Sequence, residues 1–360
     1  MRGLLKRIEV GGRRLLYRSL DRAVNSAETG VSVPEGERLD RVLLMRQDRI
    51  GDMVMTLPLI RKLREVHGLR SIGVVASEPN SIVLKHEEGV DLFVSGKAPA
   101  DFVSSLIRVR EYAPDAVVDM HMHDSTTSLV YALASGARWR LHVDRHNRLP
   151  FNIRVTAPFD GHIMDAFSAL LSGLGRELPL ERLDREVRNS REEEEFARRF
   201  WEASDPSPGD CAVVNISAGG PDRDWGTDRY VSVCRDLLAM GLVPLLLSSP
   251  SDRRKAEGIG IRAVGALVSP PTPTILHLAA LLRGTALLIS PDTSVVHLAA
   301  SMGVPVVGMY LPRDPSLPEW YPWKVPCRVI TSESAEDLGS IHADGVVSAV
   351  RELVALSLGR

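Results

Sequence analysis

Apolar and polar residues follow a repeating order along this chain, in which short apolar runs alternate with longer amphipathic segments. Runs such as VLLM and AVVDM are almost continuously apolar, which is typical of strands buried on both faces of a parallel sheet. In the first half they predict strands at Arg41–Arg46, Ile72–Ala76, Asp115–Met120 and Trp139–Val143. The segments between them predict helices over Asp52–His67, Ala100–Tyr112 and Thr126–Ser135.

The alternation restarts at Cys211 after a densely charged interruption. Further strands are predicted at Ala212–Ser217, Val243–Ser248, Val264–Val268, Thr285–Ile289 and Val304–Met309. The helices between and after them are predicted at Asp228–Met240, Ser251–Glu257, Thr274–Leu282, Thr293–Met302 and Ile341–Leu358. Strands that alternate with helices form βαβ units, so we expect an α/β fold of two doubly wound, Rossmann-like domains. In such domains ligands bind at the carboxyl ends of the strands, here in a central cleft that the two domains face.

Breaks in the pattern divide the chain, which at 360 residues is too long for one typical core. We predict a basic amphipathic extension over 1–37, an N-terminal domain over 38–182 and a charged linker with a helix over 183–210. A C-terminal domain over 211–335 follows, and a last helix within 336–360 is expected to pack back on the N-terminal domain.

Composition excludes several classes of protein. No apolar run approaches the roughly 18 residues that a membrane span needs. The three cysteines show no CxxC spacing, which indicates a reducing compartment and argues against disulfides or structural zinc. A net charge of −2 gives no overall attraction to nucleic acid.

The charge is unevenly distributed, because residues 1–24 carry seven basic side chains and two acidic ones. Leucines give this segment an apolar side, so it could lie on an anionic bilayer surface. It lacks the apolar region and cleavage site of a signal peptide. A frayed basic extension is the alternative, since Gly11 and Gly12 interrupt any helix here.

The segment SPDTSVVHLAASMGVPVV, residues 290–307, is the most informative motif. A strand leads into a helix whose first residues are Asp292, Thr293 and Ser294, and His297 lies one turn further along. The first backbone N–H groups and the positive end of the helix dipole then converge on one spot, which suits a diphosphate. The alternative is an ordinary helix capped by Asp292, with His297 as a buried polar residue.

A second motif, RVLLMRQDRIGDMVMTLPLIRKLRE, spans residues 41–65. Gly51 allows the chain to turn after the strand, and Asp52 begins a helix at the strand's carboxyl edge. A carboxylate near a helix N-terminus stays ionised and can accept a proton, although Asp52 could also serve only as the N-cap. No GxGxxG or GxxxxGK[ST] sequence occurs, so dinucleotide and P-loop sites lack support.

Together these two motifs resemble the glycosyltransferase family 9 heptosyltransferases, and the resemblance covers roughly residues 40–358. It implies a GT-B architecture with an acceptor-binding N-terminal domain and a nucleotide-sugar-binding C-terminal domain. It also implies an inverting transfer without metal or cofactor, from ADP-heptose to a lipopolysaccharide-core or related glycolipid acceptor.

Carried over by position, the family's general base falls on Asp52 and its diphosphate motif on Asp292, Thr293, Ser294 and His297, with Ser294 in place of the usual glycine. Arg223 stands where the family often has a lysine before Trp-Pro, and Gly226 replaces that proline. A cation there would neutralise charge on the leaving diphosphate. Asp252 is the candidate for contacting the ribose, although capping of the next helix explains it almost as well.

Two carboxylates and two histidines leave other interpretations open. Asp222 and Asp224 form a DxD sequence, which binds metal in other transferases, but the domain pattern is not of that class. Strand alternation would put His121 and His123 on one face, where they and Gly51 could contact the acceptor. A metal site at these histidines has no third ligand in view, and simple packing at the strand end is the remaining alternative.

The sequence therefore predicts a cytoplasmic, metal-independent glycosyltransferase that works on the inner face of the membrane. The alternatives are a nucleotide-sugar epimerase on the same scaffold, a GT-B transferase that uses another nucleotide sugar, or a non-catalytic relative.

Overall fold

A computed structural model of the chain describes residues 30–96, 98–123, 125–143, 151–158, 160–314 and 317–358. These residues form two compact units. The first contains the residues up to Arg49 together with Thr56–Asp184, and the second contains Ile50–Met55 and the residues from Arg185 onward. Most of the predicted basic extension falls on residues 1–29, which lie outside the described residues.

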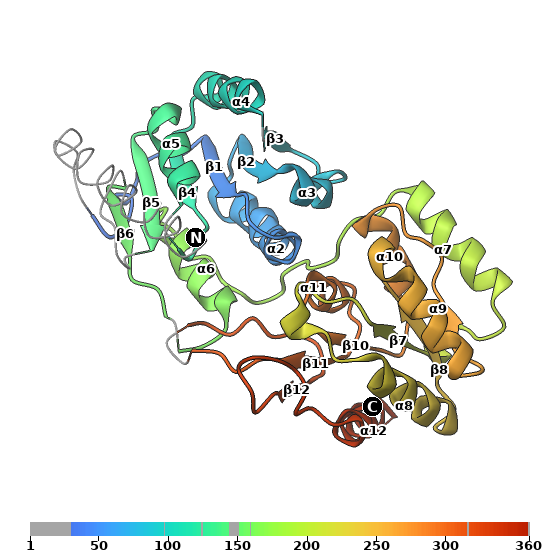
Figure 1. Cartoon of the computed structure of the whole chain (residues 1–360). Coiled ribbons are helices and arrows are strands. Elements are labelled where there is room, and N and C mark those ends of the chain that lie inside the picture. The colour runs from blue at the N-terminus through green and yellow to red at the C-terminus, as the bar shows by residue number, and fades with distance from the viewer. Residues whose placement is uncertain are drawn as a thin grey trace, which may run out of the picture. The chain divides into compact units, whose positions relative to one another are not determined.

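The first unit is a parallel sheet of six strands with helices packed on it (Figure 1). The strands are β1 (Arg41–Arg46), β2 (Ser71–Ser77), β3 (Val90–Ser95), β4 (Ala116–Asp119), β5 (Trp139–Val143) and β6 (Ile153–Val155), in the order β3-β2-β1-β4-β5-β6. The helices are α2 (Ile50–His67), whose residues Ile50–Met55 belong to the second unit, α3 (Glu78–Ser81), α4 (Pro99–Tyr112), α5 (Thr126–Ser135) and α6 (Ile163–Ser172). The strand order reverses between β1 and β4, the point where such sheets bind ligands.

The second unit repeats this arrangement. Its strands are β7 (Cys211–Asn215), β8 (Val243–Leu247), β9 (Leu267–Val268), β10 (Leu287–Pro291), β11 (Val306–Tyr310) and β12 (Cys327–Thr331), in the order β12-β11-β10-β7-β8-β9. Its helices are α7 (Arg191–Ala203), α8 (Thr227–Ala239), α9 (Arg253–Arg262), α10 (Ile275–Leu282), α11 (Ser294–Ser301) and α12 (Ala343–Leu358). Here the order reverses between β7 and β10. We call the carboxyl ends of β7 and β10 the second switch point, and those of β1 and β4 the first.

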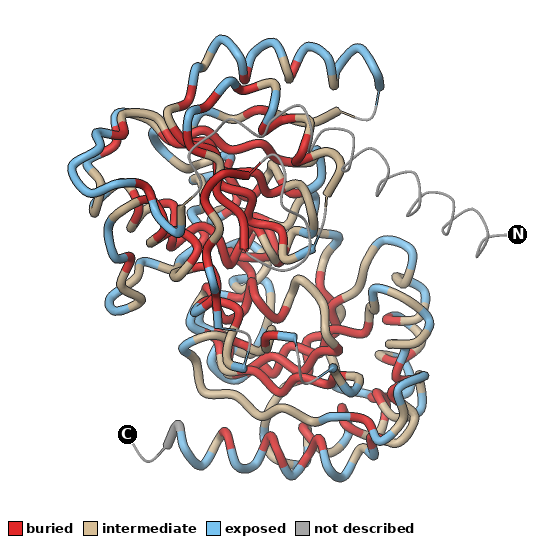
Figure 2. The backbone as a smooth tube through the Cα atoms, turned by 90° about the vertical axis from the view of Figure 1, so that its left-hand side faces the viewer, coloured by how far each residue is buried: buried red, intermediate tan, exposed pale blue. Residues whose placement is uncertain are grey.

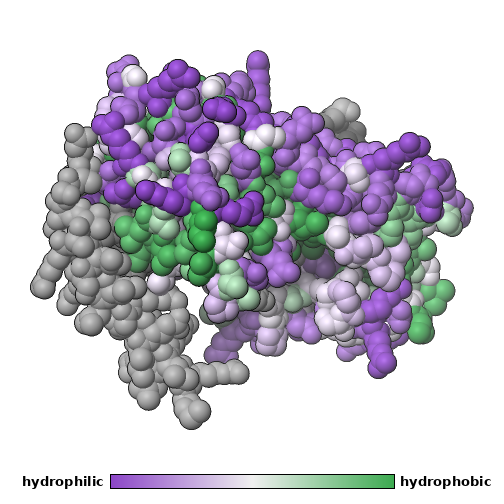
Figure 3. Space-filling view, turned by 90° about the horizontal axis from the view of Figure 1, so that it is seen from above, coloured by the Kyte–Doolittle hydropathy of each residue, from purple (hydrophilic) through white to green (hydrophobic). Residues whose placement is uncertain are grey.

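The strands form the centre of each unit, as the buried segments in Figure 2 show. Trp225 is fully buried in the second unit, where its indole N–H donates to the Ile341 carbonyl at 2.8 Å and its ring meets Tyr230 edge-on. In the view of Figure 3 most described side chains on the surface are hydrophilic. Within the described residues, no helix is both long enough and apolar enough to cross a bilayer.

Two segments take places that differ from those expected. The charged segment over 183–210 is not only a linker, because its helix α7 packs on α10 within the second unit. The C-terminal helix α12 packs on α8 and β12, and its Val346, Val350 and Leu353 are buried in the second core. Its apolar face is therefore used in the C-terminal unit, where the sequence interpretation had placed it on the N-terminal one.

Most predicted elements are present with shifts of one or two residues. Strands β3, β6 and β12 and helices α3 and α6 were not predicted, and of these only β6 and α3, with three and four residues, are very short. The predicted strand Val264–Val268 shrinks to Leu267–Val268, since Gly265 adopts a φ of +103° that belongs to a turn.

Candidate functional site

The second switch point is organised by one buried amide. Asn215, the last residue of β7, is 2% exposed. Its side-chain N–H₂ donates to Ser290 Oγ at 2.9 Å and to Thr293 Oγ1 at 3.2 Å. Because β7 and β10 are neighbours, this amide joins the ends of both strands and fixes the turn that leads into α11.

Helix α11 begins at Ser294, and its N-cap is Thr293 rather than Asp292. The hydroxyl of Thr293 makes no capping hydrogen bond and contacts Asn215 and Ser290 instead. The first N–H groups of a helix have no partner inside the helix, and the helix dipole adds positive potential at this end. The simple capping role for Asp292 is therefore wrong, and the anion site at this helix start stays a prediction.

Arg223 lies against this helix end. It closes the 3₁₀ turn Pro221–Arg223, and its Nη1 is 3.1 Å from both the backbone carbonyl and Oδ2 of Asp292. The side chains of Arg223 and Asp292 are 24% and 30% exposed, so this ion pair is accessible to a ligand. Gly226 follows with a φ of +96°, a conformation closed to proline, which explains why this chain departs from the Trp-Pro pattern.

Asp252 lies in the same unit, at the end of the 3₁₀ turn Pro250–Asp252 that follows the neighbouring strand β8. Its Oδ2 accepts hydrogen bonds from Ser217 Oγ at 2.6 Å and Ser249 Oγ at 2.8 Å. Although Asp252 occupies the N-cap position of α9, its side chain makes no capping bond. The carboxylate is thus oriented by two hydroxyls, and the capping alternative does not account for it.

Both carboxylates of the DxD sequence, Asp222 and Asp224, form ion pairs within the chain. Lys255 Nζ is 2.5 Å from Asp224 Oδ1, and Arg223 Nε is 3.7 Å from Asp222 Oδ2. Burial alone would raise the pKa of Asp224, but the bond from Lys255 holds it below its usual value. Among the described residues, no group of three His, Cys, Asp or Glu side chains is arranged to hold a metal ion.

Gly51 and Asp52 lie in the first turn of α2, within the stretch Ile50–Met55 that belongs to the second unit. A Cβ atom on Gly51 would be 2.7 Å from His297 Cδ2 and 3.3 Å from Ser294 Cα. Glycine therefore lets the start of α2 approach the start of α11. Asp52 is the third residue of its helix, so it is not the N-cap, and it is partly buried.

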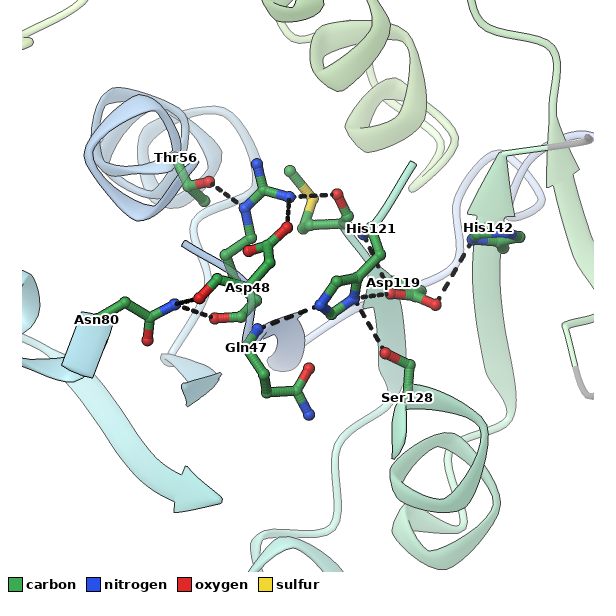
Figure 4. A network of polar contacts seen from close by, with 10 residues as sticks. Gln47, Asp48, Thr56, Asn80, Asp119, His121, Ser128 and His142 are labelled. Carbon is green, nitrogen blue, oxygen red and sulfur yellow. Dashed lines mark hydrogen bonds and ion pairs between the residues drawn. The ribbon is translucent and has the colours of Figure 1, made fainter. Parts of the chain in front are cut away.

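The first switch point holds a network of polar side chains that Figure 4 shows. Arg46, the last residue of β1, is 0% exposed. Its guanidinium donates to Thr56 Oγ1 at 3.1 Å, Asp48 Oδ2 at 3.0 Å and the Met120 carbonyl at 2.6 Å. It also lies 4.6 Å from the centroid of the Phe167 ring. This arginine thus ties β1 to the segment after β4.

A buried carboxylate–imidazole pair lies beside this arginine. His121 Nδ1 is 2.6 Å from Asp119 Oδ1, and His121 Nε2 accepts from the backbone N–H of Gln47 at 3.3 Å. Burial opposes the charged form of His121, but the Asp119 carboxylate outweighs it and raises the pKa of the imidazole. Burial alone would raise the pKa of Asp119 too, yet the neighbouring histidines hold it below its usual value.

The two candidate acceptor histidines take different positions. Both follow β4, which ends at Asp119, so strand alternation does not place them. His121 is 3% exposed and belongs to the network, whereas His123 is exposed and meets the His121 ring edge-on at 5.7 Å. Sequence reasoning missed Arg46, Asp119 and Asn215, although each is a polar residue at the end of an apolar strand, a signal that could have found them.

Comparisons with known proteins identify the family of the chain. The model of glycosyltransferase family 9 (heptosyltransferase) matches residues 104–340, more than half of the 360-residue chain. The chain belongs to glycosyltransferase family 9. The resemblance to this family is thereby confirmed, and with it the assignment as a glycosyltransferase rather than an epimerase. The matched residues include the motif over 290–307.

Individual family 9 proteins are distant relatives. The chain is 22% identical over 294 residues to the lipopolysaccharide core heptosyltransferase OpsX of Haemophilus influenzae. The aligned region covers 76% of this chain and 79% of OpsX. A family 9 structure from Veillonella parvula is similar with a TM-score of 0.75 and 19% identity, over 88% of this chain and 97% of that one. The Escherichia coli heptosyltransferase WaaC with ADP-2-deoxy-2-fluoro heptose is similar with a TM-score of 0.69 and 19% identity, over 87% and 99% of the two chains. These structures confirm the predicted α/β fold of GT-B type.

Proposed function

We propose that this family 9 enzyme transfers heptose from ADP-heptose to a sugar of a lipopolysaccharide core or a related glycolipid, with inversion and without a metal ion. The observation that carries the proposal is the contact of Arg223 with Asp292 at the N-terminus of α11. Through this contact a cation lies beside the helix end and near the hydroxyl of Thr293, at the second switch point. Support for the sugar and the acceptor comes from the names of the relatives OpsX and WaaC.

The donor diphosphate is expected to bind at the first N–H groups of α11. Arg223 would then exchange part of its contact with Asp292 for the phosphate oxygens, to which a guanidinium can make two parallel bonds. Asp252, held by Ser217 and Ser249, is oriented to accept hydrogen bonds from the ribose hydroxyls.

The reaction needs a base and a stabilised leaving group. In the proposed step, the Asp52 carboxylate takes the proton of an acceptor hydroxyl while its oxygen forms a bond to the anomeric carbon. The bond from that carbon to the diphosphate breaks, and ADP leaves with the electron pair. Arg223 and the α11 N-terminus are already in place, so they can stabilise the charge on ADP without reorganising.

A location at the inner face of the membrane is part of the proposal, because the acceptor is a glycolipid. The basic segment 1–24 carries a charge of +5 and an apolar side, and each basic residue near an anionic surface contributes about 1 kcal/mol. Such attraction would hold the enzyme reversibly at the leaflet where its acceptor is found.

The test is a transfer assay with ADP-heptose and a lipopolysaccharide-core acceptor, comparing the wild type with Asp52→Asn. We expect the variant to keep the fold and the affinity for ADP while turnover falls by about 10² or more, the scale of a lost general base. Asp344→Asn is the matched control, because Asp344 is an exposed acidic residue in the first turn of α12 and also interacts with a helix dipole. Equal activity of Asp52→Asn and Asp344→Asn would refute the role of Asp52, and no transfer by the wild type would refute the choice of donor or acceptor.

A further inference from the structure

The loop between β1 and α2 carries the chain from the first sheet to the proposed base, and side chains hold it at three successive residues. Asn80 Nδ2 donates to the Arg46 carbonyl at 2.9 Å and to the Asp48 carbonyl at 3.4 Å. Arg46 Nη1 binds the Asp48 carboxylate. Between these two residues, the Gln47 N–H donates to His121 Nε2. Of these contacts, only the last depends on a group that can change its charge near neutral pH.

The orientation of His121 is fixed from the opposite side of its ring. Asp119 Oδ1 accepts from the His121 backbone N–H at 3.1 Å and lies 2.6 Å from Nδ1, and Ser128 Oγ lies 3.0 Å from the same nitrogen (Figure 4). The neutral tautomer with its proton on Nδ1 satisfies both sides at once, because Nδ1 donates to the carboxylate while Nε2 accepts from Gln47. Asp119 therefore selects the tautomer that can hold the loop.

We infer that His121 is a positioning residue for the transfer reaction, and that Asp119, His121 and Gln47 form a relay that fixes the loop leading to Asp52. The inference rests on the proposed function, since it assumes that Asp52 is the base. Asp52 follows Gln47 by five residues, in the first turn of the helix that the loop begins. A catalytic group that is displaced by about 1 Å can lose about 10² in rate, so the loop's position bears directly on turnover.

The relay gives the loop a dependence on pH. When His121 is protonated on Nε2, the ring becomes a donor there and can no longer accept from Gln47. The charged groups around the ring are the following: Asp119, Asp48, Arg46 and, when protonated, His142 and His123. Because Asp119 raises the pKa of His121, the loop is released as the pH falls through that raised value.

Protonation has opposite consequences for stability and for turnover. The raised pKa of His121 means that its charged pair with Asp119 stabilises the fold fully below the unfolded pKa of about 6.5, and that this contribution is lost as the pH rises through the folded value. This pair thus favours the fold until the pH falls through the lowered pKa of Asp119, while the loop contact is already lost at higher pH. An acid limb of activity without acid unfolding is the expected signature.

Three variants test the relay in the transfer assay. His121→Ala removes the acceptor for Gln47, and we expect kcat to fall about 10- to 100-fold while KM for the donor changes little. His121→Gln places an uncharged amide near the position of Nε2, so it should restore most of kcat and remove the acid limb. Asp119→Asn keeps an acceptor for Nδ1–H but removes the charge, so the acid limb should move to lower pH.

A matched control and a second measurement separate this inference from the proposed function. His142→Gln changes a buried histidine that faces the other oxygen of Asp119 at 3.7 Å and should leave kcat near the wild-type value. Amide hydrogen exchange at Gln47 needs no substrate and should accelerate in His121→Ala but not in His142→Gln. Unchanged exchange in a folded His121→Ala variant, or an unchanged acid limb in Asp119→Asn, would overturn the relay. A wild type that is inactive with ADP-heptose while exchange responds as expected would instead count against the proposed function.

Discussion

Replacing Gly51 by alanine tests the approach of α2 to α11 with a single methyl group. The new Cβ would be 2.7 Å from His297 Cδ2 and 3.3 Å from Ser294 Cα. Carbon atoms pack best at about 3.5–4.0 Å, so the methyl group would have to push the imidazole away by about 1 Å. His297 is 6% exposed and its ring meets Trp320 edge-on, which leaves it little room to move.

The size of the effect follows from two opposing contributions. Alanine in place of glycine favours a helix by up to about 1 kcal/mol. Overpacking of a tight contact costs about 1–3 kcal/mol, and here one of the two contacted atoms belongs to the backbone of α11. The net penalty of about 1–2 kcal/mol would act on the start of the helix that is proposed to bind the diphosphate. If ADP binds only when this helix start is undisplaced, the penalty falls on the bound state and weakens ADP binding by up to about 30-fold.

Calorimetric titration with ADP and thermal unfolding measure the two parts separately. Gly258→Ala is the matched control, because Gly258 lies inside α9 and a Cβ there meets no atom within 4 Å. That control should raise the melting temperature and leave ADP affinity unchanged. If Gly51→Ala bound ADP as tightly as Gly258→Ala and melted no lower, the close contact between the two helix starts would be refuted.

Three further predictions concern charge. Arg223→Ala should lower kcat by about 10²–10³ in the transfer assay, which is the scale of one lost donor to a developing anion. Arg223→Lys should recover part of this loss, and equal rates for the alanine and lysine variants would contradict a charge-based role. EDTA should leave transfer intact, since Arg223 and α11 are proposed to neutralise the diphosphate. Activity that is lost on chelation and restored by Mg²⁺ or Mn²⁺ would instead support Asp222 and Asp224 as metal ligands. Deleting residues 1–24 should weaken binding to anionic vesicles and slow transfer to a membrane-embedded acceptor, but it should not slow transfer to a delipidated acceptor. High salt should mimic the deletion because it screens the attraction. Unchanged vesicle binding would rule out the segment as the anchor.

The alternation of apolar runs with helical segments predicted the two doubly wound units because each central strand is buried on both faces and so lacks polar residues. The junction between β10 and α11 was predictable for a local reason, since a strand, a small polar residue and a helix follow each other directly at Ser290–Ser294. The contacts that organise these sites were not predictable in the same way. Asn215 reaches a residue 75 positions away, and His121 reaches Gln47 across 74.

Local charge patterns also misled in a specific way. The acidic and basic residues of α7 suggested a linker, but Arg198 and Arg199 pair with Glu195 on the exposed side while the other side packs on α10. Asp292 and Thr293 differ by one position, and only the backbone conformation decides which of them is the N-cap. Sequence spacing places such residues on one turn, and tertiary contacts then assign their roles.

The repeated strand order has a consequence for the number of nucleotides that one chain binds. Arg46 and Asn215 are the last residues of equivalent strands, and each reaches across to the segment that follows the neighbouring strand, Arg46 to Met120 and Asn215 to Thr293. At the first switch point Arg46 already pairs with Asp48 and His121 with Asp119, so each basic side chain has a carboxylate partner and a nucleotide diphosphate would have to compete with it. At the second switch point the side chains of Ser290 and Thr293 carry hydroxyls instead of charges, and they lie beside the start of α11. A chain built from two copies of one nucleotide-binding topology is therefore expected to saturate with a single equivalent of ADP.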